Sequence, residues 1–395
     1  MKSIGEVSAF ISDGDWIESK DQSERGIRLL QVGNIGLSEF IPKDERAKYI
    51  SEETYAKLNC TEIFPGDILI SRLPEPVGRA CIVPDGLGRC ITAVDCTILR
   101  LNESECDKRY FINYTQSPTY FFKLKRFLTG TTRIRISRKN LESVEIPLPP
   151  LDVQRRIAET LDKVTELISL RKTQLGKLDE LVKARFVEMF GDLASPECKW
   201  NREKLVDACV NSDDIKCGPF GTQLSKDEYV DTGVAVWEIP QINSLFVTTP
   251  THYLTEEKAR QLEAYSIKSG DIAMSRKGNV GKCAVFPSNF EAGIIHSDVL
   301  RIRVDDSRVL PLFMMHQLHY SGAVQHQIEL VSSGAIMAGI NVTKLKQIFI
   351  HIPPMELQNQ FVAFVEQTDK SKAIIQQSLD TLETLKKSLM QEYFG

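Results

Sequence analysis

The stretch LDVQRRIAETLDKVTELISLRKTQLGKLDELVKARFVEMFG, residues 151–191, decides the fold of this chain. Its apolar residues recur at alternating steps of four and three, at Ile157, Leu161, Val164, Ile168, Leu175, Leu178 and Val182. This 3.5-residue period is typical of a coiled-coil seam rather than of an ordinary surface helix. Pro150 just before the stretch and Gly191 at its end suit a helix start and a helix end. We therefore predict one helix about 55 Å long, which cannot bury its seam without a partner.

The same chain contains a second copy of this stretch. It lies 204 positions later (353 − 149 = 204, from Pro149 to Pro353), begins HIPPMELQNQFVAFVEQTD and ends LMQEYFG. Gln358 matches Gln154, and the register continues to the closing Phe-Gly pair without a gap. A repeat of this kind determines the whole fold. We predict that the two helices pair with each other in an antiparallel coiled coil.

The segments in front of the two helices also share a pattern. PGDILISRLPEPVGRACIVP, residues 65–84, corresponds to SGDIAMSRKGNVGKCAVFP, residues 269–287, and both alternate turn and strand signals. TGTTRIRISRKNL, residues 129–141, corresponds to SSGAIMAGINVTKL, residues 332–345. We predict an α/β protein in which two repeated mixed α/β domains are separated by the two long helices, with pseudo-twofold symmetry. A common frame with different intervening residues indicates one task performed on two targets, although drift in a duplicated fold would give the same pattern.

We place the predicted boundaries from these repeats. The first domain covers residues 1–148, the first long helix 149–191, the second domain 192–352 and the second long helix 353–395. A chain of 395 residues is too long for one ordinary core. The hydrophobic content of 42% and charged content of 26% are typical of a soluble globular protein.

Several features favour a cytoplasmic protein. The sequence has no run of about eighteen apolar residues, so we expect no membrane span. Its first residues, MKSIGEVSAFISDGDW, contain acids where a signal peptide needs an apolar stretch. The nine cysteines form no CxxC pair, which favours reduced thiols.

The distribution of charge points to nucleic acid, although the net charge of −4 does not. Residues 108–141 contain one acid-free run of basic side chains interleaved with aromatic ones. Basic side chains neutralise phosphates and release counterions, and arginine also reads guanine edges. The aromatic residues more often belong to a core, and a solvated charged face is the other interpretation of the basic run. The candidate DNA contacts of the two domains are Arg72, Arg79, Lys123, Lys125, Arg126, Thr131, Thr132, Arg133, Arg135, Arg276, Lys277, Asn279, Lys282, Ser332 and Ser333.

The helices supply a second set of candidate residues. The predicted contacts between the helices or with partner subunits are Ile157, Leu161, Val164, Ile168, Leu175, Leu178, Val182, Phe186, Phe361, Val365, Ile375, Leu379, Leu382, Leu385 and Leu389. Basic residues such as Arg171, Lys372 and Lys386 interrupt the seam, where their stems can cover apolar surface. Either they fray the packing edge, or other proteins cover the remaining apolar faces, such as those of Phe186, Phe190, Phe364 and Leu385.

Motifs for catalysis are absent from the sequence. It contains no G-x-x-x-x-G-K-[ST] phosphate loop and no Asn-Pro-Pro-aromatic tetrad of the adenine methyltransferase type. His316 and His319 lie three apart on a predicted helix, but no further metal ligands are near them in the sequence, so a core or surface role is favoured. We therefore predict no catalytic, cofactor or metal residues in this chain.

The quoted motifs resemble one family over the whole chain. LPPLDVQRRIAETLD at residues 148–162 and IPPMELQNQFVAFVEQTD at 352–369, with GDILISR and GDIAMSR before them, are similar to the specificity subunits of type I restriction-modification systems. The resemblance implies two target-recognition domains that each read one half of a split double-stranded DNA sequence. It also implies partners: two modification subunits that use S-adenosylmethionine to methylate adenine, and restriction subunits that use ATP and Mg. The chain itself would do no chemistry and carry no cofactor.

Two other classes of function stay open at this point. One is a complete DNA methyltransferase or nuclease with an unrecognised site, against which the missing motifs argue. The other is a coiled-coil adaptor that binds only protein, against which the basic run argues.

Overall fold

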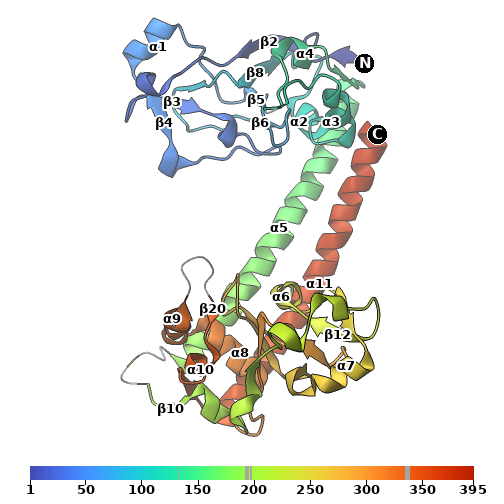
Figure 1. The fold of residues 1–395 in the computed structure, drawn as a ribbon. Coiled ribbons are helices and arrows are strands. Elements are labelled where there is room, and N and C mark those ends of the chain that lie inside the picture. The colour runs from blue at the N-terminus through green and yellow to red at the C-terminus, as the bar shows by residue number, and fades with distance from the viewer. Residues whose placement is uncertain (132, 192–194, 196–197, 334–338) are drawn as a thin grey trace. The chain divides into compact units, whose positions relative to one another are not determined.

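The computed structural model describes residues 1–131, 133–191, 195, 198–333 and 339–395, and it forms two compact units. Unit 1 comprises Met1–Thr173 with Gln376–Gly395, and unit 2 comprises Gln174–Ile375. The two long helices are α5 (Leu151–Phe190), green in Figure 1, and α11 (Met355–Phe394), red in the same view. Each of them contributes one half to each unit. Both confirm the helices that the 3.5-residue period predicts.

Three sheets form the domain of unit 1. The largest is antiparallel, with strand order β2-β8-β5-β6, and the second has the order β4-β3-β7 with β3 and β7 parallel. The third pairs β1 with β9, so the first residues of the domain lie against its last. The strands are β1 (Lys2–Ser3), β2 (Ser8–Asp13), β3 (Ile27–Leu30), β4 (Lys48–Ile50), β5 (Ile68–Ser71), β6 (Ala80–Ile82), β7 (Cys90–Thr92), β8 (Cys96–Leu101) and β9 (Glu145–Ile146).

Four short helices complete this domain, and each begins at a residue whose side chain caps it. They are α1 (Glu52–Leu58), α2 (Lys108–Tyr114), α3 (Pro118–Lys125) and α4 (Arg138–Glu142). Their caps are Ser51, Asp107, Ser117 and Ser137, whose side-chain oxygens accept bonds from backbone N–H groups of the first turn. Such caps are the preferred helix starts because they satisfy donors that have no partner within the helix. The turn residues of the sequence therefore fix where these helices begin.

The core of unit 1 joins its domain to both long helices. Tyr110 and Tyr114 of α2 pack their rings at 5.4 and 5.5 Å from the ring of Phe394, the last residue of α11. Ile157 and Leu161 near the start of α5 belong to the same buried cluster. The predicted interleaved aromatics of residues 108–141 thus serve mainly as core, which was the alternative interpretation of the pattern.

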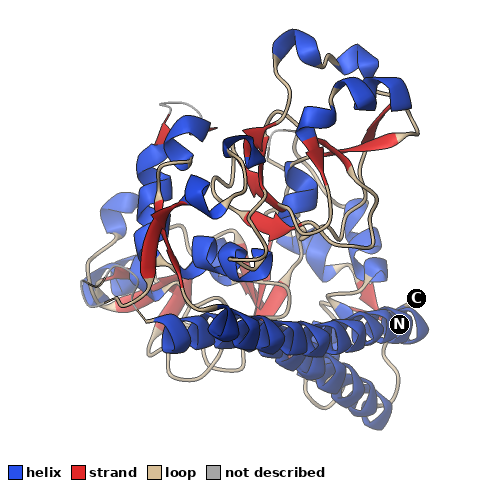
Figure 2. Cartoon of the chain, turned by 90° about the horizontal axis from the view of Figure 1, so that it is seen from below, coloured by secondary structure: helices blue, strands red, loops and turns tan. Residues whose placement is uncertain are grey.

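The domain of unit 2 repeats this design. Its main antiparallel sheet has the order β11-β18-β15-β16, and its second sheet has the order β13-β12-β17-β14 with β12 and β17 parallel. Strand β10 pairs with β21 as β1 does with β9. The strands are β10 (Asn201–Lys204), β11 (Ile215–Cys217), β12 (Val234–Trp237), β13 (His252–Leu254), β14 (Ser266–Ile267), β15 (Ile272–Ser275), β16 (Cys283–Val285), β17 (Gly293–Ile295), β18 (Val299–Ile302), β19 (Ser332–Ser333), β20 (Gly339–Ile340) and β21 (Phe349–Ile352). The predicted repeat of mixed α/β domains is confirmed, and Figure 2 shows strands only outside the long helices.

An aromatic cluster holds unit 2 together. Its short helices are α6 (Ile239–Asn243), α7 (Glu256–Gln261), α8 (Pro311–Tyr320), α9 (Gly322–Val331) and α10 (Val342–Leu345). Phe186 and Phe190 of α5 lie 5.5 and 5.6 Å, ring to ring, from Phe361 of α11, and both contact Phe313 of α8. All four rings are buried. The interpretation that another protein covers Phe186 and Phe190 is therefore wrong, because this unit's own core covers them.

Each unit pairs the helices in antiparallel fashion. In unit 1 Lys172 Nζ lies 3.0 Å from Glu383 Oε1, while the residues about Leu161 meet the end of α11. In unit 2 Lys372 Nζ lies 2.7 Å from Asp179 Oδ1, while Phe186 meets Phe361 near the start of α11. Residue numbers fall along α11 as they rise along α5, which confirms the predicted antiparallel pairing.

The seam follows the predicted heptad positions with one exception. Buried or half-buried residues of α5 and α11 include Ile157, Leu161, Val164, Ile168, Leu175, Leu178, Val182, Phe186, Phe361, Val365, Ile375, Leu379, Leu382 and Leu389. The exception is a predicted contact outside the heptad: Leu385 is 44% exposed one position before Lys386, which takes the seam site, so of the two predicted kinds of contact only one with a partner subunit stays open for it. Lys386 Nζ lies 3.3 Å from Gln116 Oε1, and burial lowers the pKa of Lys386. No helix of the described chain is both long and apolar enough to cross a membrane.

Candidate nucleic-acid interface

In unit 1 the candidate interface begins where the strands of the main sheet end. Arg72 follows β5 directly, and its Nε lies 3.5 Å from the carboxylate of Asp13, the last residue of β2. Its Nη2 donates to the carbonyl of Val94 at 2.5 Å. The backbone of Arg72 is held as well, since its N–H donates to the carbonyl of Asp95 at 2.9 Å and its carbonyl accepts from the N–H of Ile136 at 3.2 Å. A cationic side chain is thus fixed at this edge of the sheet.

A hairpin with a basic tip lies against this edge. Thr129 and Arg135 exchange both backbone hydrogen bonds at 2.9 Å, which closes a turn over the residues between them. Gly130 has a φ of +97° and stands so close to the carbonyl of Arg133 that a side chain would clash, so this turn requires glycine. The side chain of Arg133 is 70% exposed, with its Nη2 3.4 Å from Asp95 Oδ2. The predicted contacts Thr131 and Arg135 are exposed beside it, whereas Thr132 lies outside the described residues.

Unit 2 builds the same edge from the corresponding residues. Arg276 follows β15, its N–H donates to the carbonyl of Asp298 at 2.9 Å and its carbonyl accepts from the N–H of Ile340 at 3.1 Å. Its Nε also donates to the Ile340 carbonyl at 3.1 Å. Lys277 Nζ forms an ion pair with Asp298 Oδ1 at 2.7 Å. The paired strands β19 and β20 correspond to the hairpin of unit 1. The predicted contacts Ser332 and Ser333 make up β19.

Arg79 does not belong to the interface. The sequence marked it as a DNA contact, but it is buried, and its guanidinium donates to the carbonyls of Ile35, Leu73, Pro76 and Val32 at 2.7 to 3.0 Å. Burial lowers the pKa of Arg79. Since its Nε, Nη1 and Nη2 all donate to carbonyls of its own domain, we assign it to the scaffold. The sequence could not show this because an arginine after a turn suits either role.

Three other predicted contacts also hold the backbone of their own unit. Lys123 Nζ donates to the Glu145 carbonyl at 2.8 Å, and Lys282 Nζ donates to the Asn243 carbonyl at 2.9 Å. Ser332 Oγ donates to the Ile328 carbonyl at 2.7 Å. By contrast Lys125, Arg126 and Asn279 are exposed. The structure therefore gathers Arg72, Arg133 and Arg135 in unit 1, and Arg276 and Lys277 in unit 2, at one edge of each main sheet.

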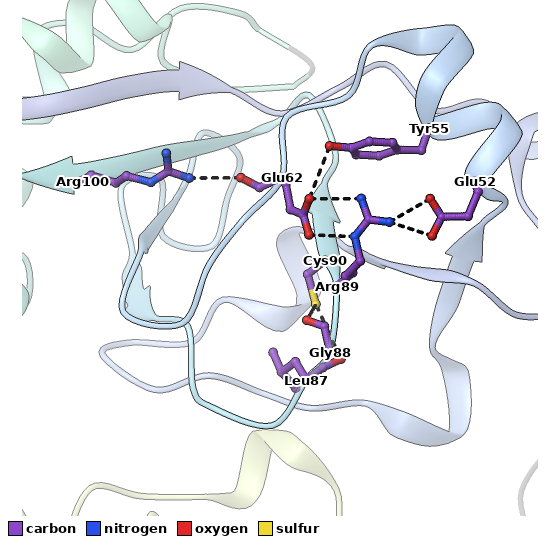
Figure 3. Close-up of polar contacts among 8 residues, drawn as sticks. All are labelled: Glu52, Tyr55, Glu62, Leu87, Gly88, Arg89, Cys90 and Arg100. Carbon is purple, nitrogen blue, oxygen red and sulfur yellow. Dashed lines mark hydrogen bonds and ion pairs between the residues drawn. The ribbon is translucent and has the colours of Figure 1, made fainter.

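A conspicuous arginine elsewhere in unit 1 is already neutralised. Figure 3 shows Arg89 between Glu62 and Glu52: its Nε lies 2.9 Å from Glu62 Oε1, and its Nη1 lies 2.7 Å from Glu52 Oε1. The bonds from Glu62 and then from Glu52 raise the pKa of Arg89. The guanidinium also lies over the ring of Tyr55, 4.9 Å from its centroid. Phosphate would have to compete with two carboxylates here, so we leave Arg89 out of the interface.

Charge pairs within the sheets serve the scaffold in both units. Arg100 makes a paired contact with Asp67 at 2.8 and 2.9 Å, and Arg303 does the same with Asp271 at 2.7 Å. In each unit the aspartate is the buried partner and belongs to the Gly-Asp-Ile motif of the sequence. A buried carboxylate needs such a partner because an unpaired one is very costly. The repeated Gly-Asp-Ile is thus a structural motif.

His316 and His319, for which the sequence favours a core or surface role over a metal site, both pack inside unit 2. His316 of α8 is buried, stacks on Tyr320 at 5.2 Å and meets Phe361 edge-on at 5.4 Å. His319 Nε2 accepts a hydrogen bond from the backbone N–H of Cys283 at 3.1 Å. Within the described part of the chain, no group of three or more His, Cys, Asp or Glu residues could hold a metal ion.

The sequence reasoning missed two residues at this edge. Trp16 follows the end of β2 and Phe220 follows the end of β11, and both rings are exposed. Gly14 and Gly218 precede them by two positions and are themselves 204 positions apart (218 − 14 = 204). The internal repeat could have found this pair, but only the structure shows that these rings are exposed while other aromatic residues enter the cores.

Comparison with known proteins gives a consistent result. The family model described as the type I restriction modification DNA specificity domain matches residues 1–180 and 220–384. The chain is 21% identical over 374 residues to the putative type I restriction enzyme MjaX specificity subunit of Methanocaldococcus jannaschii, covering 91% of this chain and 82% of that protein. It is 21% identical over 324 residues to the type I restriction enzyme EcoBI specificity subunit of Escherichia coli, covering 75% and 67%. The fold is similar to the crystal structure of a type I restriction-modification system S subunit from M. genitalium, with a TM-score of 0.60, 13% identity and coverage of 100% and 95%.

Proposed function

The chain belongs to the family of type I restriction-modification DNA specificity proteins, and from this premise we propose that it reads a split DNA target, one half with each domain. It is a specificity subunit that recognises DNA sequence. The split target is supported by one observation above all. The carbonyl of Arg72 accepts a hydrogen bond from Ile136 in unit 1, and the carbonyl of Arg276 accepts the equivalent bond from Ile340 in unit 2. The hairpin residues just before Ile136 and Ile340 differ between the two domains.

The differing hairpins are where sequence would be read. Phosphate contacts position a protein on DNA, whereas side chains that reach base edges specify the sequence. Arg133 can donate two parallel bonds to a guanine edge, a geometry that no residue of the corresponding tip in unit 2 can copy, because TTRIR corresponds there to AIMAG. Two domains with one frame and unlike tips therefore recognise unlike half-sites.

We assign the chemistry to other subunits. The proposed assembly contains two modification subunits that methylate adenine with S-adenosylmethionine, and restriction subunits that use ATP and Mg. This chain directs them to the target and acts where the chromosome lies, in the cytoplasm. The absence of a phosphate loop and of a methyltransferase tetrad from the sequence supports this division of labour.

Methylome sequencing tests the proposal in one step. A host that expresses the chain with its modification subunit should carry methylated adenines in a motif of two short half-sites separated by unread base pairs. A host that expresses the modification subunit alone should lack that motif. A continuous motif, or methyl transfer by the purified chain alone, would contradict the proposal and favour a complete methyltransferase.

A domain exchange assigns the halves. Replacing residues 1–148 with the corresponding domain of a relative should change one half-site and leave the other. The matched exchange of residues 192–352 should do the reverse. If either exchange altered both half-sites, the one-domain, one-half assignment would fail.

A further inference from the structure

Each domain presents one exposed aromatic ring at the same place in its fold. Trp16 is 71% exposed and Phe220 is 46% exposed, and each stands two residues after a glycine that directly follows a strand of the main sheet. Single exposed apolar side chains are common on proteins. Two rings at equivalent positions of two domains are not explained by that rule. The residues between glycine and ring differ, Asp15 in one domain and Pro219 in the other, while the aromatic character is kept.

The backbone holds these rings in position. The loop of Gly14 lies so close to the carbonyls of Thr92 and Ala93 that a side chain at Gly14 would clash with both. The Gly14 N–H donates to Cys96 and the Asp15 N–H donates to Thr92, both at 2.8 Å. The ring that follows is therefore placed by a rigid turn rather than by a loose loop.

The same construction appears in unit 2. A side chain at Gly218 would clash with the carbonyls of Ile295 and His296. The Gly218 N–H donates to Val299 at 3.2 Å. Glycine permits the close approach in both domains, which explains why it is the residue that the repeat keeps.

Both rings stand at the basic edge of their sheet. The guanidinium carbon of Arg276 lies 4.8 Å from the centroid of the Phe220 ring. In unit 1 Trp16 comes three residues after Asp13, whose carboxylate contacts Arg72, and the indole donates only to the exposed Glu18, at 3.4 Å. The guanidinium of Arg276 also donates from Nε to the Ile340 carbonyl and from Nη1 to the Ser297 carbonyl, which holds its positive charge against the ring. Aromatic surface and positive charge thus share one edge of each domain.

We propose that Trp16 and Phe220 contact DNA directly, each laying its ring against a base or deoxyribose of the half-site read by its own domain. This proposal rests on the proposed function and names a contact within it. A duplex presents deoxyribose rings and thymine methyl groups as apolar surface in its grooves, so such a ring adds affinity without displacing counterions. A ring placed by a rigid turn loses little conformational freedom on binding.

The fluorescence of Trp16 can be measured separately, because the chain has only two other tryptophans and both lie in different surroundings. Trp237 is buried, and Trp200 is half-buried with its indole bonded to the Phe190 carbonyl at 2.8 Å. The difference in emission between the natural chain and Trp16→Phe therefore isolates Trp16. The chain, assembled with its modification subunits, is titrated with the duplex found by methylome sequencing. Acrylamide quenching of the difference emission should fall when target duplex binds.

Affinity measurements complete the test. Trp16→Ala should weaken target binding at least about fivefold, as expected for truncating an aromatic residue buried in an interface. The slope of log K against log salt should stay unchanged, because no charge is removed. Phe220→Ala should act likewise. Phe122→Ala is the matched control, since Phe122 is 70% exposed on α3, and it should leave target affinity unchanged.

Each outcome has a defined meaning. If labelled target DNA binds while the quenching of Trp16 and the affinity of Trp16→Ala stay unchanged, the aromatic contact is refuted and the proposed function stands. If no target duplex binds even the natural assembly, the proposed function itself fails. If the Trp16 signal changes on adding modification subunit without DNA, and Trp16→Ala impairs assembly, the ring contacts protein and the proposal is overturned.

Discussion

Gln154 Oε1 accepts a hydrogen bond from the backbone N–H of Asp107 at 2.9 Å, which fixes the start of α5 to the N-cap of α2. Its Nε2 donates to the carbonyls of Glu105 and Pro149 at 2.9 and 2.8 Å. Gln154 is fully buried, so no water replaces these bonds. A single side chain thus joins the domain, the Pro-Pro leader and the long helix into one body.

The second copy repeats this joint. Gln358 Oε1 accepts from the Leu310 N–H at 2.9 Å, and its Nε2 donates to the carbonyls of Arg308 and Pro353 at 3.0 and 2.8 Å. The glutamine of the repeated Pro-Pro motif therefore has a structural role. Its amide oxygen accepts one hydrogen bond and its amide nitrogen donates two, and these three bonds form in both units.

Replacing Gln154 with alanine should destabilise unit 1 strongly. The change leaves one N–H and two carbonyls of half-buried residues without their glutamine partner, and such a group costs up to about 1–3 kcal/mol. We expect the free energy of unfolding to fall by about 3 kcal/mol, measured as a lower urea midpoint. Gln376→Ala is the control, because Gln376 is exposed and bonds only to Asp380 on its own helix. Equal midpoints for the two variants would show that the buried bonds do not hold the joint.

Arg133→Ala and Arg79→Met should separate binding from folding. Arg133 is exposed at the hairpin tip, so its removal should weaken DNA binding and reduce the slope of log K against log salt by about 0.9 for each phosphate that Arg133 neutralises. Thermal unfolding should be unchanged. Arg79→Met leaves four carbonyls without their donor and should lower the unfolding temperature. A stable, DNA-defective Arg79→Met would reverse our assignment of that residue.

Gly176→Ala should stabilise the protein. Gly176 lies inside α5, and nothing stands within 4 Å of the position of an added Cβ. Glycine in a helix interior costs roughly 1 kcal/mol relative to alanine, so calorimetry should show a gain of about that size. Gly14→Ala should do the opposite, because its Cβ meets the backbone carbonyls of Thr92 and Ala93. A loss of stability in Gly176→Ala would show that this point of the helix needs its flexibility.

Unit 2 should lose stability in acid through His316. Burial, then the nearby His319 and Lys372, lower the pKa of His316 from 6.5 to about 3 in the folded state. The unfolded chain therefore binds a proton between pH 6.5 and 3 that the folded chain does not, and stability falls as pH falls through this range. From about pH 6.5 to about pH 5 the loss from this group should be about 2 kcal/mol at most.

His316→Phe keeps a ring against Tyr320 and Phe361 and removes the titration. Urea midpoints at about pH 7.5 and about pH 5 should therefore lie closer together in this variant than in the natural chain. His326→Phe is the control, because His326 is exposed on α9 and lies outside the aromatic cluster. If the urea midpoints of His316→Phe at the two pH values differ as much as those of the natural chain, another group causes the acid sensitivity.

The sequence by itself determined the architecture of this protein. The 3.5-residue period of residues 151–191 predicted a helix and its recurrence predicted the partner, because heptad spacing places one apolar stripe along a helix that needs a matching stripe. The repeat also placed the strands of Ile68–Ser71 and Ile272–Ser275 in equivalent positions. Such information depends on neighbouring residues or on a regular spacing, so it can be read from the sequence alone.

Only the tertiary structure decided which basic and aromatic residues are available to DNA. Arg79 and Arg133 stand in similar surroundings in the sequence, yet Arg79 bonds to four carbonyls, those of Val32 and Ile35 among them from a distant segment, and Arg133 is exposed. Phe186 enters the core of unit 2, while Trp16 stays outside because Gly14 brings its loop against a strand end. Whether a side chain is accessible to DNA depends on which segments of the chain fold over it. Many of those segments are distant in the sequence, so the residues next to the side chain do not predict its exposure.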